Sequence, residues 1–254
     1  APARQPPRLK RGETPTRAWT LTGPYGSGKS YFSLFLMRLF GVTQSYHKYT
    51  FHQLAEIDKA LAHQLEQVLD HHSTQGLLAI PITCYRASLT ECLKHGLMLS
   101  LKGEKKHAQV KPLLAELEQW SETTDSRTIV RWLRQPLSVI TQPDIGYLGA
   151  LLVFDELGKS LEFSAARPDG AEIYLLQELA EFANRSGDTP LIFVGVLHQA
   201  FERYAALLDL KTQQEWAKVQ WRFEDISFQE PPNQQIRLLA NAIEYNDGRK
   251  LRPV

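Results

Sequence analysis

Short apolar, β-prone runs recur along the chain, and longer segments with helical spacing separate them. The runs are "AWTLTG" (18–23), "GLLAIPIT" (76–83), "ALLVFDE" (150–156) and "PLIFVGVL" (190–197). An apolar run without polar alternation, as at 150–156, is typical of a parallel strand covered on both faces. We therefore predict four buried strands, and "FEDISF" (223–228) follows a helix expected at about 209–220.

The segments between these runs carry apolar residues at three- and four-residue spacing, which indicates amphipathic helices. Residues 29–40 are apolar almost all round, which favours a fully buried helix, and Gly41 can cap its end. Further helices are expected at about 52–69, 87–101, 110–120, 173–183 and 209–220, and another opens near 231. Strands that alternate with helices predict an α/β protein with a mainly parallel sheet.

Composition and charge restrict the number of domains, the partners and the cellular location that we expect. The 254 residues are 43% hydrophobic and carry a net charge of +1, which fits one large domain with no overall electrostatic attraction to nucleic acid. Two cysteines are too few for a disulfide framework, so we expect a cytoplasmic location. No apolar run reaches the length of a membrane span, so no membrane association is expected. Residues 1–16, with four prolines and several basic residues, predict an extended basic arm.

The stretch "LTGPYGSGKSYF" (21–32) places glycines and a lysine between a predicted strand and a predicted helix. Gly23, Gly28, Lys29 and Ser30 fit the pattern G-x-x-x-x-G-K-[ST]. Successive backbone amides of such a loop, with the start of the following helix, form a nest for an anion. Lys29 is expected to reach the terminal phosphates of a nucleotide and Ser30 to ligate Mg²⁺. The predicted nucleotide-binding residues are Gly23, Pro24, Tyr25, Gly26, Ser27, Gly28, Lys29, Ser30 and Tyr31.

Two acidic residues, Asp155 and Glu156, end the run "LLVFDE". Ligands of open parallel sheets bind at the carboxyl ends of the strands, so both side chains should face the same crevice as Lys29. We predict that Asp155 supports Mg²⁺ together with Ser30, and that Glu156 is the general base for the attacking water. The structural alternative is an acidic strand end that caps the next helix. His198 and Gln199 follow the next strand and are candidates for sensing the terminal phosphate or holding the water.

The pair "GPYGSGKS" and "LLVFDE" resembles the Walker A and Walker B motifs of P-loop NTPases. A glutamate after the Walker B aspartate is typical of the ASCE division, which includes AAA+ and STAND ATPases. This resemblance implies a three-layer sandwich with strand order 5-1-4-3-2, and ATP and Mg²⁺ as ligands. Lys29 and Asp155 are 126 residues apart, which leaves room for a helical insertion within about 45–145, at 45–75 or 103–145.

Residues 220–243, "QWRFEDISFQEPPNQQIRLLANAI", are similar to the AAA+ region in which an arginine, a strand and a proline-initiated lid helix follow one another. On that match Arg222 falls at the position of an arginine finger, and 231–254 is the start of a helical lid or a linker to a further region, after a core at 17–230. The stretches "FDELGKSLEF", "LLQELAE" and "HQAFERY" also look like large P-loop ATPases of bacterial phage-defence islands. A homo-oligomer or a subunit of a multiprotein complex is therefore expected.

Three functions remain open at this point. The first is a Mg²⁺-dependent ATPase that acts as a conformational switch or motor, with Glu156, Lys29, Arg222 and His198 as its catalytic residues. The second is a nucleotide-gated module that assembles on DNA and hydrolyses ATP slowly. The third, a small-molecule kinase, is disfavoured because the sequence offers no clear acceptor pocket. Lys159 and Ser160, in "DELGKS", imitate half of the Walker A pattern, but Val153 stands where a second glycine would be needed.

Overall fold

The computed structural model describes residues 16–41, 44–72, 75–121, 124–167 and 171–228. Its five strands are β1 (Ala18–Thr22), β2 (Leu77–Thr83), β3 (Gly149–Asp155), β4 (Leu191–Leu197) and β5 (Glu224–Ser227). They form one parallel sheet in the order β2-β3-β4-β1-β5. This is the predicted order 5-1-4-3-2 read from the other edge of the sheet.

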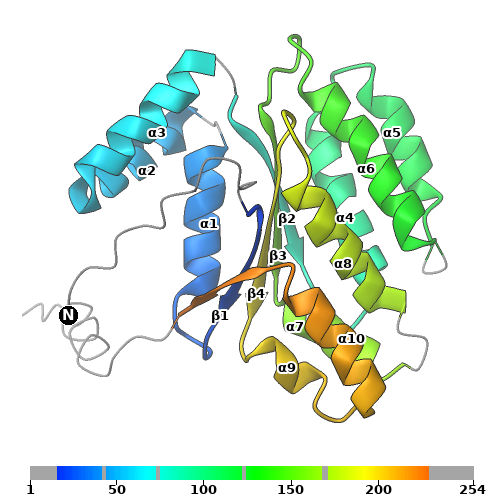
Figure 1. The fold of residues 1–254 in the computed structure, drawn as a ribbon. Helices are drawn as coiled ribbons and strands as arrows, with labels where there is room; N and C mark the ends of the chain where they lie inside the picture. Colours follow the sequence, from blue (N-terminus) through cyan, green and yellow to red (C-terminus); the bar gives the residue numbers. More distant parts are fainter. Residues whose placement is uncertain (1–15, 42–43, 73–74, 122–123, 168–170, 229–254) are drawn as a thin grey trace, which may run out of the picture.

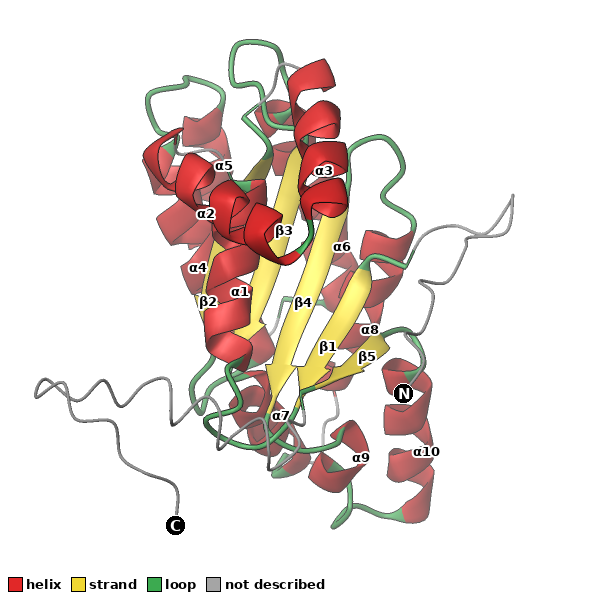
Figure 2. Ribbon diagram, turned by 90° about the vertical axis from the view of Figure 1, so that its left-hand side faces the viewer, coloured by secondary structure: helices red, strands yellow, loops and turns green. Residues whose placement is uncertain are grey.

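Helices cover both faces of the sheet, so the described chain has three layers (Figure 1). One face carries α1 (Lys29–Phe40), α2 (Gln44–Ile57) and α3 (Lys59–His72). The other carries α4 (Leu89–Gly103), α5 (Val110–Glu118), α6 (Ser126–Ile140), α8 (Ala171–Asn184) and α10 (Leu210–Gln220). The short helices α7 (Leu157–Ala165) and α9 (Phe201–Tyr204) lie at the carboxyl ends of the strands, as Figure 2 shows from the side.

The core consists of apolar layers on the two sides of the sheet. On the side of α4, α6 and α8, Phe154 of β3 and Phe193 of β4 are fully buried and stack with ring centroids 4.8 Å apart. On the side of α1, a smaller cluster includes Leu21, Val153 and Val194. Because the central strands bury both faces, their unbroken apolar sequences are explained by this layering.

The two edge strands are held in different ways. Pro81 of β2, which has no amide hydrogen to donate, is exposed on the edge strand, where a proline costs least. Strand β5 has exposed side chains but is tied to β1 by Asp225, whose Oδ1 accepts hydrogen bonds from Thr20 Oγ1 at 2.6 Å and Thr22 Oγ1 at 2.5 Å. These bonds fix the register of β5 beside the loop that follows β1.

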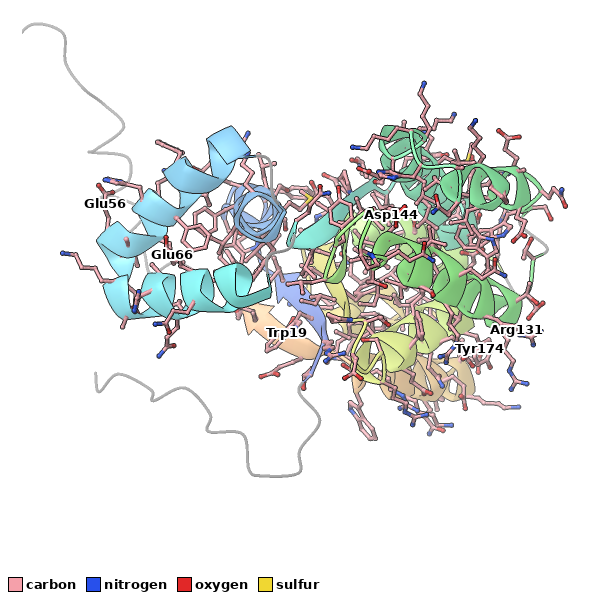
Figure 3. All side chains as sticks on the ribbon, turned by 90° about the horizontal axis from the view of Figure 1, so that it is seen from above. Trp19, Glu56, Glu66, Arg131, Asp144 and Tyr174 are labelled. Atoms are coloured by element: carbon pink, nitrogen blue, oxygen red, sulfur yellow. The ribbon has the colours of Figure 1, made fainter. Side chains whose placement is uncertain are left out.

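The helix predicted at 52–69 is two helices, so that prediction was wrong. The chain breaks at Asp58, whose Oδ1 accepts from the amide of Leu61 and so caps the start of α3. A single capping side chain thus divides a segment whose apolar residues keep helical spacing throughout. The α2–α3 pair stands on the far side of α1 from the sheet (Figure 3), and a small cluster around Leu39, Leu54 and Ala62 joins the three helices.

Three further helices, α6, α7 and α9, were not singled out by the sequence pattern. α6 falls within the span predicted as an insertion, as do α2, α3 and α5. Trp120 and Trp132 pack edge to face in the core, with ring centroids 4.9 Å apart, and Cys84 and Cys92 are buried free thiols. The lid predicted at 231–254 and all but the last residue of the predicted arm at 1–16 lie outside the described residues.

Candidate functional site

The loop between β1 and α1 has the backbone that an anion nest needs. Gly26 and Gly28 have φ angles of 77° and 88°, a left-handed conformation that side chains with a Cβ atom adopt at a cost. The first amides of α1, which begins at Lys29, have no partners within the helix. A cavity of about 260 Å³ lies against this loop. Its lining residues are Tyr25, Gly26, Ser27, Gly28, Lys29, Ser30, Tyr31, Asp155, Glu156, Val196 and His198.

Gly23 has another role in the loop. A Cβ atom at this position would lie 2.3 Å from the carbonyl oxygen of Phe228, which directly follows β5. The amide of Phe228 also donates to the carbonyl of Thr22 at 2.7 Å. The first glycine of the motif is therefore required by the close passage of the chain after β5, whereas Gly26 and Gly28 shape the cavity itself.

Lys29 is buried and folds back onto its own loop. Its Nζ donates to the carbonyl oxygens of Gly23 and Pro24, each at 2.7 Å, and to Ser27 Oγ at 3.2 Å. Burial lowers the pKa of Lys29, and the charges of Asp155 and Glu156 oppose that shift. Gly23 and Pro24, two of the nine predicted binding residues, therefore contact the lysine, while the other seven line the cavity.

Ser30 and Asp155 meet directly across the cavity. Ser30 Oγ donates to Asp155 Oδ1 at 3.0 Å, and the same oxygen accepts from the amide of Glu156 at 3.0 Å. Asp155 ends β3, and β4 separates that strand from β1 in the sheet. The carboxyl ends of these parallel strands share one edge, which brings the two motifs together as predicted.

Glu156 has an unusual backbone. Among the described residues it is the only non-glycine with a positive φ, at 58°. It is the N-cap residue of α7, yet its side chain makes no capping hydrogen bond, so the alternative in which this residue caps the helix is not observed. Its carboxylate forms an ion pair with Lys159, with Oε2 and Nζ 2.5 Å apart. Strain of this kind at a cavity is a common feature of functional sites.

His198 forms another wall of the cavity. Its ring stacks on Tyr25 with centroids 4.3 Å apart and an angle of 21° between the planes. The stack joins the end of β4 to the glycine-rich loop. His198 therefore lies where it was predicted, whereas Gln199, its alternative, is not among the residues that line this cavity.

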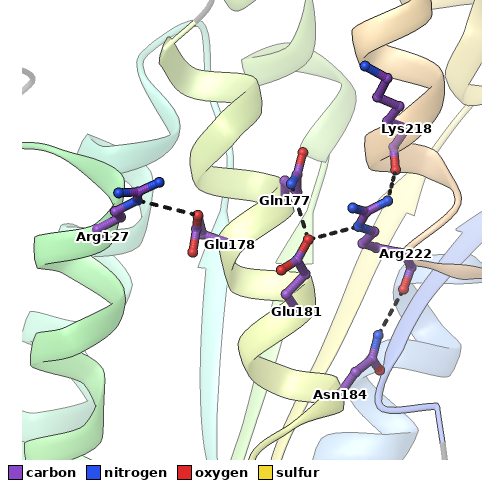
Figure 4. A network of polar contacts seen from close by, with 7 residues as sticks. All are labelled: Arg127, Gln177, Glu178, Glu181, Asn184, Lys218 and Arg222. Atoms are coloured by element: carbon purple, nitrogen blue, oxygen red, sulfur yellow. Dashed lines mark hydrogen bonds and ion pairs between the residues drawn. The ribbon is translucent and has the colours of Figure 1, made fainter.

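Arg222 lies away from this group. It comes just before Glu224, which begins β5 and pairs with Trp19 near the start of β1. Arg222 therefore lies at the amino ends of the strands, whereas the cavity lies at their carboxyl ends. Its Nε donates to Glu181 Oε1 at 2.9 Å, and its carbonyl accepts from Asn184 Nδ2 at 3.0 Å (Figure 4). Burial raises the pKa of Glu181, but hydrogen bonds from Arg222 and Gln177 outweigh it and bring the pKa below its usual value.

Sequence reasoning assigned no role to two residues of this region: Lys159 was considered only as part of an incomplete Walker A pattern, and Tyr204 was not considered. The i, i+3 spacing of Glu156 and Lys159 was a usable signal for their ion pair. No sequence signal pointed to Tyr204, whose hydroxyl would be 2.3 Å from a Cβ atom at Gly158. Burial raises the pKa of Tyr204 to about 12, against the effect of the nearby amides of His198 and Gln199.

The described residues contain no group of three or more His, Cys, Asp or Glu side chains that could hold a metal ion by themselves. Mg²⁺ does not require such a group, because it commonly binds one or two protein ligands together with substrate phosphates. Within the same residues, no helix is both long and apolar enough to cross a bilayer. Comparison of the chain with protein-family models, curated proteins and solved structures found no match.

Proposed function

We propose that this chain is a Mg²⁺-dependent P-loop nucleoside triphosphatase, with ATP as its nucleotide. One observation carries the proposal: Lys29, Ser30, Asp155 and Glu156 come from two distant segments and line the same cavity. A chance glycine-rich turn would need no acidic pair opposite it. The site also fits the metal, because a hydroxyl and a carboxylate oxygen, both suitable partners for Mg²⁺, lie 3.0 Å apart at its edge.

The loop residues supply the positive end of the site. Amides at the start of α1 and the Lys29 ammonium bind the phosphate oxygens, and anionic phosphates are stronger acceptors than the neutral carbonyls that Lys29 now contacts. Mg²⁺, when bound, would neutralise charge on the transferred phosphoryl group. Ser30 is the residue that would ligate it, and Asp155 would hold that hydroxyl and the metal's remaining ligands in place.

Glu156 is the general base of the proposed reaction. Its carboxylate lines the cavity beside Asp155, where it can accept a hydrogen bond from a water molecule and orient that water for attack. The Tyr25–His198 stack forms another side of the cavity. The loop, the lysine and the carboxylate pair would together supply positioning and electrostatic stabilisation, which provide most of the rate in phosphoryl transfer.

Within this class, we place the chain with AAA+ and STAND ATPases that act as a switch or motor in a larger assembly, including those of anti-phage defence. The strand order and the Asp-Glu pair support this placement. Arg222 lies at the opposite ends of the strands from its own cavity. A residue that completes the site of a neighbouring subunit would lie on this side of the molecule. Such a role requires Arg222 to exchange Glu181 for a phosphate group. If so, mixing Arg222→Ala with Lys29→Ala subunits should restore activity that neither variant has alone, and no recovery at any ratio would exclude a shared site.

The direct test is release of phosphate from ATP by the wild type and by Glu156→Gln, with and without Mg²⁺. We expect wild-type turnover to require the metal, and the variant to keep ATP binding while it loses about 10²- to 10⁴-fold in turnover. A parallel set of reactions with duplex DNA decides the alternative, because stimulation by DNA would favour a module that assembles on DNA. Failure of the wild type to bind ATP in a direct binding assay would overturn the proposal.

A further inference from the structure

Lys159 is a cation beside the cavity that the proposed function leaves without a role. It lies one turn into α7, three residues after Glu156, and its Nζ is 2.5 Å from Glu156 Oε2. It does not appear among the residues that line the cavity. Its side chain is 44% exposed, compared with 30% for Glu156, so the ion pair links the surface to the edge of the site.

The turn of α7 that carries Lys159 is fixed on both sides. Gly158 packs so closely on the Tyr204 hydroxyl that a Cβ atom would be 2.3 Å from it. Ser160 is buried, and its Oγ lies 3.5 Å from Cys92 Sγ of α4. The backbone at Lys159 is thus held in place by its neighbours, and the long side chain alone reaches back to Glu156.

Glu156 needs a cation as its partner, because its backbone conformation prevents its carboxylate from accepting the usual hydrogen bonds from helix amides. An acidic N-cap residue normally accepts from the amides of the next turn, but Glu156 has a left-handed φ of 58° and makes no capping bond. The Oε2 atom is also buried, and no described residue donates a hydrogen bond to it. A buried carboxylate oxygen is costly without a cation or a donor, and Lys159 provides the charge that compensates it.

We propose that Lys159 is a positioning residue, which holds one oxygen of the Glu156 carboxylate so that the group keeps a single orientation at the edge of the cavity. This inference rests on the proposed function, in which Glu156 is the base. It assigns Lys159 no contact with ATP, because the ammonium is already engaged by Glu156, with Asp155 and Tyr25 also nearby. Lys159 acts through Glu156 alone.

The test compares Lys159→Met and Lys159→Gln with Lys159→Arg, which keeps the charge. We expect the Met and Gln variants to lower kcat by roughly 10- to 100-fold, the loss typical of a misplaced catalytic group, with KM for ATP unchanged. Lys159→Arg should recover most of the loss. Lys218→Met is the matched control, because Lys218 and Glu215 form an i, i+3 ion pair at 2.6 Å on α10, away from the cavity.

A double-mutant cycle makes the test specific. In the Glu156→Gln background, Lys159→Met should have no further effect on kcat, because the carboxylate through which Lys159 acts is no longer present. A further loss there, a raised KM, or a higher kcat in the single variant would overturn the proposal, since these outcomes indicate a direct phosphate contact or an inhibitory contact. Normal turnover in Lys159→Met beside loss in Glu156→Gln would reject the role of Lys159 alone. Normal turnover in Glu156→Gln would instead reject the base assigned under the proposed function.

Discussion

Ser30 Oγ donates a hydrogen bond to Asp155 Oδ1 at 3.0 Å, although the two residues are 125 positions apart in the sequence. The contact exists because β1 and β3 are parallel and end at the same edge of the sheet. α2, α3, β2, α4, α5 and α6 lie between the two residues in sequence without separating them in space. A hydroxyl and a carboxylate joined in this way form the metal-binding side of the proposed site.

The first prediction concerns Asp155. Asp155→Asn should keep the hydrogen bond to Ser30 but lose the charge that supports Mg²⁺, so half-maximal turnover should need about 10- to 100-fold more Mg²⁺. The measurement is phosphate release across a Mg²⁺ titration. Asp209→Asn is the control, because Asp209 caps α10 through the amides of Lys211 and Thr212, and asparagine caps equally well. An unchanged Mg²⁺ requirement in Asp155→Asn would remove this residue from the metal site.

The second prediction concerns Lys29. Lys29→Met keeps the aliphatic stem and removes the ammonium, so it should weaken ATP binding by about 10- to 100-fold, the value of one or two charge-assisted hydrogen bonds. Calorimetric titration with ATP measures this loss. Lys211→Met, on the first turn of α10, serves as the control for removing one positive charge. Wild-type affinity in Lys29→Met would show that the cavity does not bind ATP through this lysine.

The sequence predicted the order of elements well because the signals involved are local or periodic. β1 and α1 were placed by an apolar run, a glycine-rich turn and a second apolar run, and the structure agrees within one residue. The break between α2 and α3 was missed because it depends on one side chain, Asp58, that interrupts an otherwise continuous period. Patterns of burial cannot show where a local cap interrupts a helix.

The candidate site likewise has features that the sequence predicted and features that it could not predict. The sequence placed Lys29, Ser30, Asp155 and His198 at one edge of the sheet, and the structure brings them together there. The i, i+3 spacing alone is a weak indication of the Glu156–Lys159 ion pair, because the pair also depends on the left-handed backbone at Glu156, which the sequence does not reveal. Nor could it predict that Gly23 is required by the chain after β5, because only the folded sheet creates that contact.

The third prediction separates two functions of glycine in the loop. Gly23→Ala should lower the free energy of unfolding by about 1–3 kcal/mol, because its Cβ atom would overlap the backbone oxygen of Phe228 and displace the chain after β5. Urea unfolding measures the change. Gly103→Ala is the control, because a Cβ atom at this helical position has no neighbour within 4 Å and alanine favours the helix. Equal stability of Gly23→Ala and wild type would contradict the close contact.

The last prediction concerns the ion pair between Arg222 and Glu181, whose Nε and Oε1 atoms are 2.9 Å apart. The pKa of Glu181 is below its usual value of 4.5, because hydrogen bonds from Arg222 and Gln177 outweigh the effect of burial. A carboxylate with a lowered pKa stabilises the fold fully at pH values above the unfolded pKa, and loses that contribution as the pH falls through the folded pKa. Glu181→Gln should therefore cost about 1 kcal/mol near neutral pH, as expected for a partly exposed pair, and progressively less below about pH 4.5.

Urea unfolding of wild type and Glu181→Gln between about pH 7 and pH 3 measures this difference, and subtraction removes the effect of every other titrating group. Glu215→Gln is the matched control, because it breaks the more exposed pair with Lys218 and should cost less at neutral pH. A difference that stays constant over this range, or grows on acidification, would mean that Arg222 does not stabilise the charged form of Glu181. The guanidinium of Arg222 would then be held mainly by the hydrogen bond that its Nη1 donates to the Lys218 carbonyl at 2.8 Å.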